Sequence, residues 1–284
     1  MRHGKTTVLG LCFDLWERNF ILRSVNNDVQ PCHRVRRVGI PRSPNRAMLG
    51  RRGDRCPRGR APPGEGIHGR GAQNVARQAG DAGVERLIHV SGADADPAAD
   101  SPYVRAWGIG EDLVKGAFEG ATILRPNVIF GPGDSFFNTL AGMARRTPVL
   151  PLFGRGRTNL QPVFVGDVAA ACARILADPS TRGETYELGG PRVYTYKVLL
   201  RLVLKQVDRR RILVPVPFFW WDILAGFMAF LPSPPLTRDQ VKLMKRDNVV
   251  EANTLTLEDL GIGPISVEEI LPIYINPNHR NSAS

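Results

Sequence analysis

Residues 84–134 alternate between short continuous apolar runs and a helical spacing of apolar residues. Leu87–Val90 is an aliphatic run that ends at a serine, which predicts a strand buried on both faces. Tyr103–Phe118 has apolar residues at three- and four-residue steps, which indicates a helix. Ala121–Leu124 is a second short strand-like run. Strand, helix and strand in this order predict a βαβ unit of a parallel sheet.

The loops that follow these two strands, 91–102 and 125–134, should lie at one edge of the sheet. In open α/β sheets ligands bind outside the carboxyl ends of the strands. We therefore expect the functional residues at this edge. The candidates are Ser91 after the first strand, Tyr103 at the start of the helix, and Pro126, Asn127 and Val128 after the second strand.

The pattern of short strands and amphipathic helices continues to about residue 275. The sequence predicts helices over Gly71–Gly80, Phe136–Ala144, Val168–Ala177 (capped by Asp167) and Tyr194–Val207, strands over 162–165 and Tyr186–Leu188, an extended segment Ile212–Pro217, and capping boxes at Thr237–Gln240 and Ser266–Glu269. The predicted fold class is α/β, a Rossmann-like parallel sheet with helices on both faces. Its amino-terminal half is incomplete, and a small α+β carboxyl-terminal lobe follows. The expected divisions are 1–70, 71–150 and 151–284.

Phe218–Leu231 is apolar on nearly all sides. It is shorter than the roughly twenty residues that a bilayer span requires. Two interpretations remain open, a buried core helix and an interfacial segment against a membrane or a partner helix.

Charge is unevenly distributed along the chain. Residues 1–70 hold 15 Lys and Arg against 5 Asp and Glu, so they carry 10 of the 11 net positive charges. Residues 31–70 are rich in Arg, Pro and Gly and lack apolar periodicity, which predicts disorder. Three interpretations compete: a basic arm for nucleic acid or anionic lipid, a linker, and a non-native segment from a shifted reading frame or a misassigned start. The abrupt change to patterned sequence after residue 70 favours the third interpretation. Blocks of like charge are usually only solvated, which argues against a basic arm that binds nucleic acid.

The four cysteines, Cys12, Cys32, Cys56 and Cys172, show no paired spacing, which favours free thiols in a reducing compartment. A zinc site built from Cys32, His33, Cys56 and His68 fits no known finger or ribbon spacing. The expected metal set is therefore none.

Several blocks occur in order: HVS, a Tyr103-containing helix, LRP followed by FGPGD, QPVFVGDVA, and ETYELGGP. Together they resemble the atypical extended short-chain dehydrogenase/reductase family, of the NAD-dependent epimerase/dehydratase type. The similarity covers about residues 71–275. It is greatest to the branch that contains the alpha-subcomplex subunit nine accessory subunit of respiratory complex I. The glycine-rich turn that opens such a fold is not found in residues 1–70, where Thr6–Phe13 is the one strand-like run.

The resemblance implies an NAD(P) cofactor and a site of Ser or Thr, Tyr, and a Lys four residues after the Tyr. Ser91 and Tyr103 match the first two positions, but Trp107 stands where the Lys belongs. Tryptophan carries no charge that could lower the phenol pKa for proton transfer. We therefore interpret Ser91 and Tyr103 as vestigial catalytic residues. With Pro126, Asn127 and Val128 they also form the predicted cofactor contacts, although the missing turn predicts impaired cofactor binding.

The leading hypothesis is a non-catalytic Rossmann protein of the complex I accessory kind, with complex I or a membrane surface as its partner. Its expected location is cytoplasmic or peripheral at the inner membrane. One alternative is an active NAD(P)-dependent reductase or epimerase. Another is a basic-arm binder of nucleic acid or membrane surfaces. The sequence identifies no substrate.

Overall fold

The computed structural model of the chain describes residues 67–228 and 238–276. The predicted βαβ unit is confirmed: strand β1 (Ile88–Val90) leads through helix α3 (Pro102–Ala117) to strand β2 (Thr122–Pro126). The two strands are parallel, with Ile88 opposite Thr122. Ile88 is buried, as expected for a strand covered on both faces.

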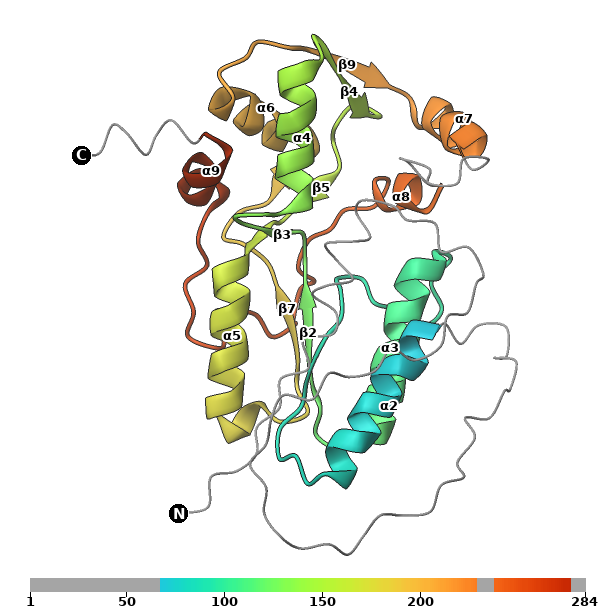
Figure 1. The fold of residues 1–284 in the computed structure, drawn as a ribbon, viewed down its shortest axis with the longest axis vertical. Helices are drawn as coiled ribbons and strands as arrows, with labels where there is room; N and C mark the ends of the chain where they lie inside the picture. The colour runs from blue at the N-terminus through green and yellow to red at the C-terminus, as the bar shows by residue number, and fades with distance from the viewer. Residues whose placement is uncertain (1–66, 229–237, 277–284) are drawn as a thin grey trace, which may run out of the picture.

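Strand β7 (Thr185–Leu188) adds to the other side of β2 in parallel, so the sheet order is β1-β2-β7. Helices α2 (Ile67–Asp81) and α3 cover one face, and helix α5 (Val165–Ala177) covers the other (Figure 1). This arrangement confirms the predicted parallel sheet with helices on both faces.

Helix α5 begins earlier than predicted. The short strand before it, β6 (Val163–Phe164), pairs in parallel with β3 (Ile129–Phe130) and passes directly into the helix at Val165. The prediction that Asp167 caps this helix is wrong. Its carboxylate instead accepts the backbone N–H of Ile265 at 2.8 Å. That partner lies far along the chain, so local sequence could not reveal it.

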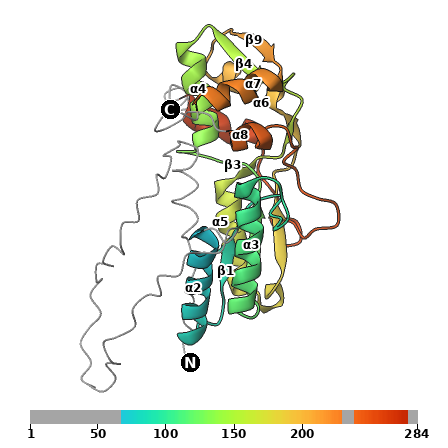
Figure 2. The same cartoon turned by 90° about the vertical axis from the view of Figure 1, so that its right-hand side faces the viewer.

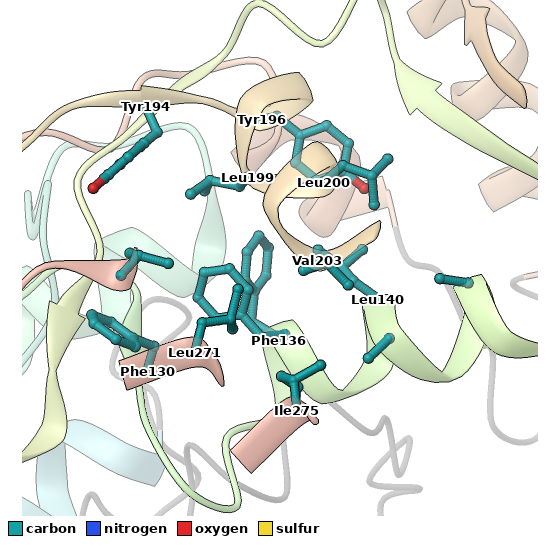
Figure 3. Packing of buried hydrophobic residues seen from close by; sticks show 14 of the residues in the cluster. Phe130, Phe136, Leu140, Tyr194, Tyr196, Leu199, Leu200, Val203, Leu271 and Ile275 are labelled. Atoms are coloured by element: carbon teal, nitrogen blue, oxygen red, sulfur yellow. The ribbon is translucent and has the colours of Figure 1, made fainter. Parts of the chain in front are cut away.

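The other half of the molecule is built around helices α4 (Ser135–Arg146), α6 (Tyr196–Gln206) and α9 (Val267–Ile275). Their buried side chains form one apolar cluster, which Figure 3 shows. The predicted helix at 194–207 begins later, because Tyr194 and Thr195 form strand β8, antiparallel to β5 (Asn159–Leu160). Thr195 then caps α6 by accepting the N–H of Val198.

Strand β9 (Ile212–Val216) lies in the segment predicted to be extended and pairs in parallel with β4 (Val149–Phe153). Helix α7 (Phe218–Met228) follows, and then α8 (Arg238–Leu243); a short 3-10 turn, Pro179–Thr181, lies after α5. The buried-core interpretation of α7 is wrong, because several of its large apolar side chains are exposed. At the start of α9, Glu269 accepts the backbone N–H of Ser266, as its capping box predicts.

Several predictions fall on residues that are not described: the strand-like run Thr6–Phe13, the basic segment up to residue 66, Thr237, and the absence of a zinc site at Cys32, His33 and Cys56. Cys172 is a free, half-buried thiol. Within ranges 67–228 and 238–276, no cluster of three metal-ligating side chains occurs. In the same ranges, each helix is too short or too polar to cross a membrane.

Candidate functional site

The carboxyl edge of β1 and β2 holds two buried polar side chains, Ser91 and Asn127. The Ser91 N–H donates to the carbonyl of Leu124 at 2.7 Å, and the Asn127 N–H donates to the carbonyl of Leu188 at 2.9 Å. The ladder of the sheet therefore continues through both residues and fixes where their side chains begin. The Ser91 hydroxyl and both polar atoms of the Asn127 amide have no hydrogen-bond partner in the described part of the chain. Buried polar atoms of this kind mark a place where water or a ligand is needed.

The neighbouring backbone groups are already engaged. The Pro126 carbonyl accepts the N–H of Ala93 at 3.2 Å, and the Val128 carbonyl accepts the N–H of Val163 at 2.9 Å. The Val128 N–H donates to the side chain of Asn248 at 3.2 Å. Of the three predicted contacts at the end of β2, Asn127 therefore has the most polar capacity left for a ligand.

The first turns of α3 lie against the loop that leaves β1. The Tyr103 and Trp107 rings have centroids 4.3 Å apart, with planes inclined by 53°. The indole also covers Gly92, the residue after Ser91, so closely that a Cβ there would lie 2.3 Å from it. One helical turn after Tyr103, the structure thus places an apolar ring directly against this loop.

The same loop is held tightly at a second point. A Cβ on Gly108 would lie 2.2 Å from the backbone nitrogen of Pro97, so helix and loop touch through the glycine backbone. The Arg105 guanidinium donates to the carbonyl of Ala99 at 2.9 Å. Arg105, the nearest basic residue to Tyr103 in sequence, is therefore used to fasten the loop.

Sequence reasoning missed a charged cluster on the α3 face of the sheet. Arg125 of β2 forms ion pairs with Glu111 of α3 at 2.8 Å and with Glu187 of β7 at 3.6 Å. Both carboxylates are buried, and Glu187 also accepts the backbone N–H of Glu251. The hydrogen bonds that Arg125 donates to the Glu111 carboxylate are the main cause that raises the pKa of Arg125. A charged residue within an apolar strand run was the available signal.

Two further groups flank this cluster. Burial lowers the pKa of His89 on β1, and the nearby Glu111 opposes that shift. Burial raises the pKa of the Asp94 carboxyl, with repulsion from Glu187 and Glu251 in the same direction. Asp94 also has a φ of 60°, which is unusual for a non-glycine residue. The ligand edge is therefore rich in carboxylates, and Arg125 is committed to two of them.

The side chains described at this edge match a nicotinamide held for hydride transfer only in part. The unsatisfied Ser91 hydroxyl and Asn127 amide could meet a polar ring substituent. However, proton transfer by Tyr103 requires a nearby cation. Four residues after Tyr103, where the resemblance implies a Lys, the chain has the Trp107 indole, which lies against Tyr103 and Gly92. These side chains therefore support no reaction step through the cofactor.

Comparison with known proteins gives sequence relatives but no match to a protein-family model. The chain is 33% identical over 208 residues to NADH dehydrogenase (ubiquinone) 1 alpha subcomplex subunit 9, mitochondrial, of Mus musculus, which covers 72% of this chain and 55% of that protein. It is 31% identical over 219 residues to the NADH-ubiquinone oxidoreductase 40 kDa subunit, mitochondrial, of Neurospora crassa, covering 77% and 57%. The chain thus spans about half the length of these curated relatives.

The fold is shared with solved structures of lower sequence identity. A dTDP-glucose 4,6-dehydratase from Streptomyces venezuelae, with NAD and TYD bound, matches with a TM-score of 0.53 at 21% identity, over 75% of this chain and 66% of that one. The chain therefore shares the Rossmann-like α/β fold of this NAD-bound dehydratase. By sequence, it is a homologue of the alpha subcomplex subunit 9 proteins of NADH dehydrogenase (ubiquinone).

Proposed function

We propose that this protein is a redox-inactive Rossmann-type accessory protein of respiratory complex I, with weak or no affinity for NAD(P). The observation that carries the proposal is the Trp107 indole, which lies against Tyr103 and Gly92. Ser91 and Tyr103 are then inherited positions that no longer catalyse a reaction.

The chemical reason is the pKa of a phenol. A tyrosine titrates at about 10, so it transfers protons near neutral pH only when a neighbouring cation stabilises the phenolate. Trp107 provides no charge, and the Arg105 guanidinium is bonded to the Ala99 carbonyl. The side chains around Tyr103 in the first turns of α3 therefore do not supply the stabilisation that the reaction needs.

The partner is inferred from the sequence relatives. Their names identify them as subunits of a respiratory NADH dehydrogenase. We propose the same assembly for this chain, with a peripheral location at the inner membrane and a membrane surface as a second contact. A structural role is consistent with the buried ionic cluster at Arg125, which joins helix α3 to strands β2 and β7 through protein groups alone.

Cofactor binding and turnover test the redox part. The purified full chain is titrated with NADH and NADPH while nicotinamide fluorescence is followed, and it is assayed with carbonyl and sugar-nucleotide substrates. We expect no saturable enhancement of nicotinamide fluorescence and no turnover of any substrate. Trp107→Lys restores the missing amine and serves as the comparison. Turnover by the unmodified chain that Tyr103→Phe abolishes would overturn the proposal.

Association with complex I is tested separately in the source cells. A tagged chain is followed on a native gel of solubilised membranes, with an NADH dehydrogenase activity stain. We expect co-migration with complex I, unchanged in a Tyr103→Phe variant. Migration of the tagged chain only as a free protein would refute the partner while leaving the redox prediction intact.

A further inference from the structure

Helix α7 presents an apolar stripe to solvent. At 100° per residue, Phe219, Trp220, Leu224 and Phe227 fall within one sector of the helix. Their side chains are 65%, 59%, 40% and 70% exposed. We call these four residues the apolar stripe. Large exposed aromatics that adjoin one another usually mark an interaction surface.

The orientation of α7 is fixed by its opposite face. Trp221 stacks on Phe153 of β4, with centroids 4.4 Å apart and planes inclined by 31°. The Phe218 ring lies against Gly154, where a Cβ would be 2.7 Å from it, and Ala225 is buried. Because these contacts seat the helix on β4, the apolar stripe points away from the body of the molecule.

A basic groove lies at the other end of strand β9. Its volume is about 600 Å³, and it is lined by one side of α6 from Lys197 onward, by the turn that follows, and by Leu213 of β9. The cations that line this basic groove are Lys197, Arg201, Lys205, Arg209, Arg210 and Arg211. Asp208 is the single acidic lining residue. Within the described part of the chain, none of the six cations forms an ion pair.

Strand β9 joins the basic groove to the apolar stripe. It runs from Ile212 to Val216, so at about 3.3 Å per residue the two features are separated by roughly 17 Å of chain. Its side chains Ile212 and Val214 are themselves exposed. Figures 1 and 2 show α6, β9 and α7 together at the end of the molecule away from the β1-β2-β7 sheet.

We propose that the apolar stripe and the basic groove together dock on an anionic phospholipid bilayer. Aromatic side chains are favoured at the boundary between headgroups and acyl chains, and clustered Lys and Arg attract anionic headgroups. The side chains Phe219, Trp220 and Phe227 enter this boundary. Five of the six cations hold lipid phosphates, because the Arg211 guanidinium already donates to the carbonyl of Ala144 at 2.8 Å. This inference rests on the proposed function, because it gives the proposed membrane contact a physical basis. Its test needs only a free bilayer, without complex I or a cofactor.

Flotation of the full chain with vesicles measures this binding. One vesicle set is phosphatidylcholine alone, and the other adds phosphatidylglycerol. We expect binding to the anionic set, reduced by salt. Each neutralised cation should weaken partitioning by about fivefold, so Arg201→Gln with Lys205→Gln should weaken it by about 25-fold. Phe219→Ser with Phe227→Ser should weaken it by at least about tenfold, from the lost apolar burial.

Matched controls separate this surface from general charge and hydrophobicity. Arg174→Gln on α5 and Ile273→Ser on α9 remove an exposed cation and an exposed apolar group elsewhere, and should leave flotation unchanged. Circular dichroism and thermal unfolding verify that every variant folds. Three results would overturn the proposal: no binding to anionic vesicles, binding insensitive to both double variants, or loss only when cations in residues 1–66 are neutralised. Binding to complex I but never to lipid would assign the surface to a protein instead.

Discussion

Arg125 and Glu111 form a two-point ion pair between strand β2 and helix α3. The Arg125 Nε donates to Glu111 Oε1 at 3.0 Å, and its Nη2 donates to Oε2 at 2.8 Å. The guanidinium keeps a second contact of 3.6 Å to Glu187 on the adjacent strand. One cation thus joins a helix to two strands at the edge where ligands would bind. Because the two carboxylates are almost fully buried, Arg125 is the cation that offsets the cost of burying them.

Replacing Arg125 by Met should therefore destabilise the fold. The variant leaves the Glu111 and Glu187 carboxylates buried without their cation, which typically costs about 3–5 kcal/mol. Arg125 is 24% exposed, so solvent screening places the expected loss near the lower end, about 3 kcal/mol. Urea unfolding followed by circular dichroism measures it.

The double variant Arg125→Met, Glu111→Met supplies the control. It removes the most tightly bonded carboxylate along with the cation, so it should be more stable than Arg125→Met alone. Equal stability of the two variants would show that the pair contributes little.

The contrast between Arg125 and Ser91 explains what sequence reasoning can reach. Ser91 follows a continuous apolar run, so its place at a sheet edge was predictable from local pattern and is confirmed. Glu111 lies in a helix that was predicted correctly, yet its partner is 14 residues away on a strand. The Ile265 partner of Asp167 is 98 residues away. Helices and strands can be predicted from the local spacing of apolar residues. The polar partners of Glu111 and Asp167 are brought together by tertiary packing, which local sequence does not show.

His89 should make stability depend on pH. Burial lowers its pKa below the ordinary 6.5, and Glu111 opposes the shift. The unfolded chain then binds more protons than the folded chain between the two pKa values. Stability is full above 6.5 and should fall as the pH drops through the folded pKa. His89→Gln should reduce this slope, which is at most about 1.4 kcal/mol per pH unit for one group. Urea midpoints from pH 7.5 to about 5 measure the difference; parallel curves would contradict it.

Asp134 caps helix α4, and its two substitutions should behave differently. Its carboxylate accepts the N–H of Phe137 at 2.6 Å. Asp134→Ala loses this bond and should cost about 1 kcal/mol, whereas Asp134→Asn keeps an oxygen acceptor. The order of thermal stability at neutral pH should be Asn above Ala.

The same carboxyl provides a second pH test of opposite sign to His89. Burial raises the pKa of Asp134 above its ordinary 3.8, against several opposing hydrogen bonds. The folded chain then binds more protons than the unfolded one, so stability should fall as pH rises from 3.8 through the folded pKa. Asp134→Asn removes this dependence. The Asp134→Asn variant should therefore gain stability relative to the unmodified chain as pH rises. A difference in stability that stays constant with pH would refute the raised pKa of Asp134.

Gly92 and Trp107 should be strongly coupled, because the indole lies where a Gly92 side chain would begin. A Cβ on Gly92 would meet three indole carbons at 2.3, 2.5 and 2.6 Å. Gly92→Ala should therefore cost about 1–3 kcal/mol by overpacking. In a Trp107→Ala background the methyl group has room, so the same substitution should cost far less. Gly142→Ala, whose added methyl meets nothing within 4 Å, should be neutral or slightly stabilising in both backgrounds. A double-mutant cycle measures the coupling.

Additive effects of Gly92→Ala and Trp107→Ala on stability would mean that the indole does not cover the loop after Ser91. The physical basis for a redox-inactive site would then fail as well.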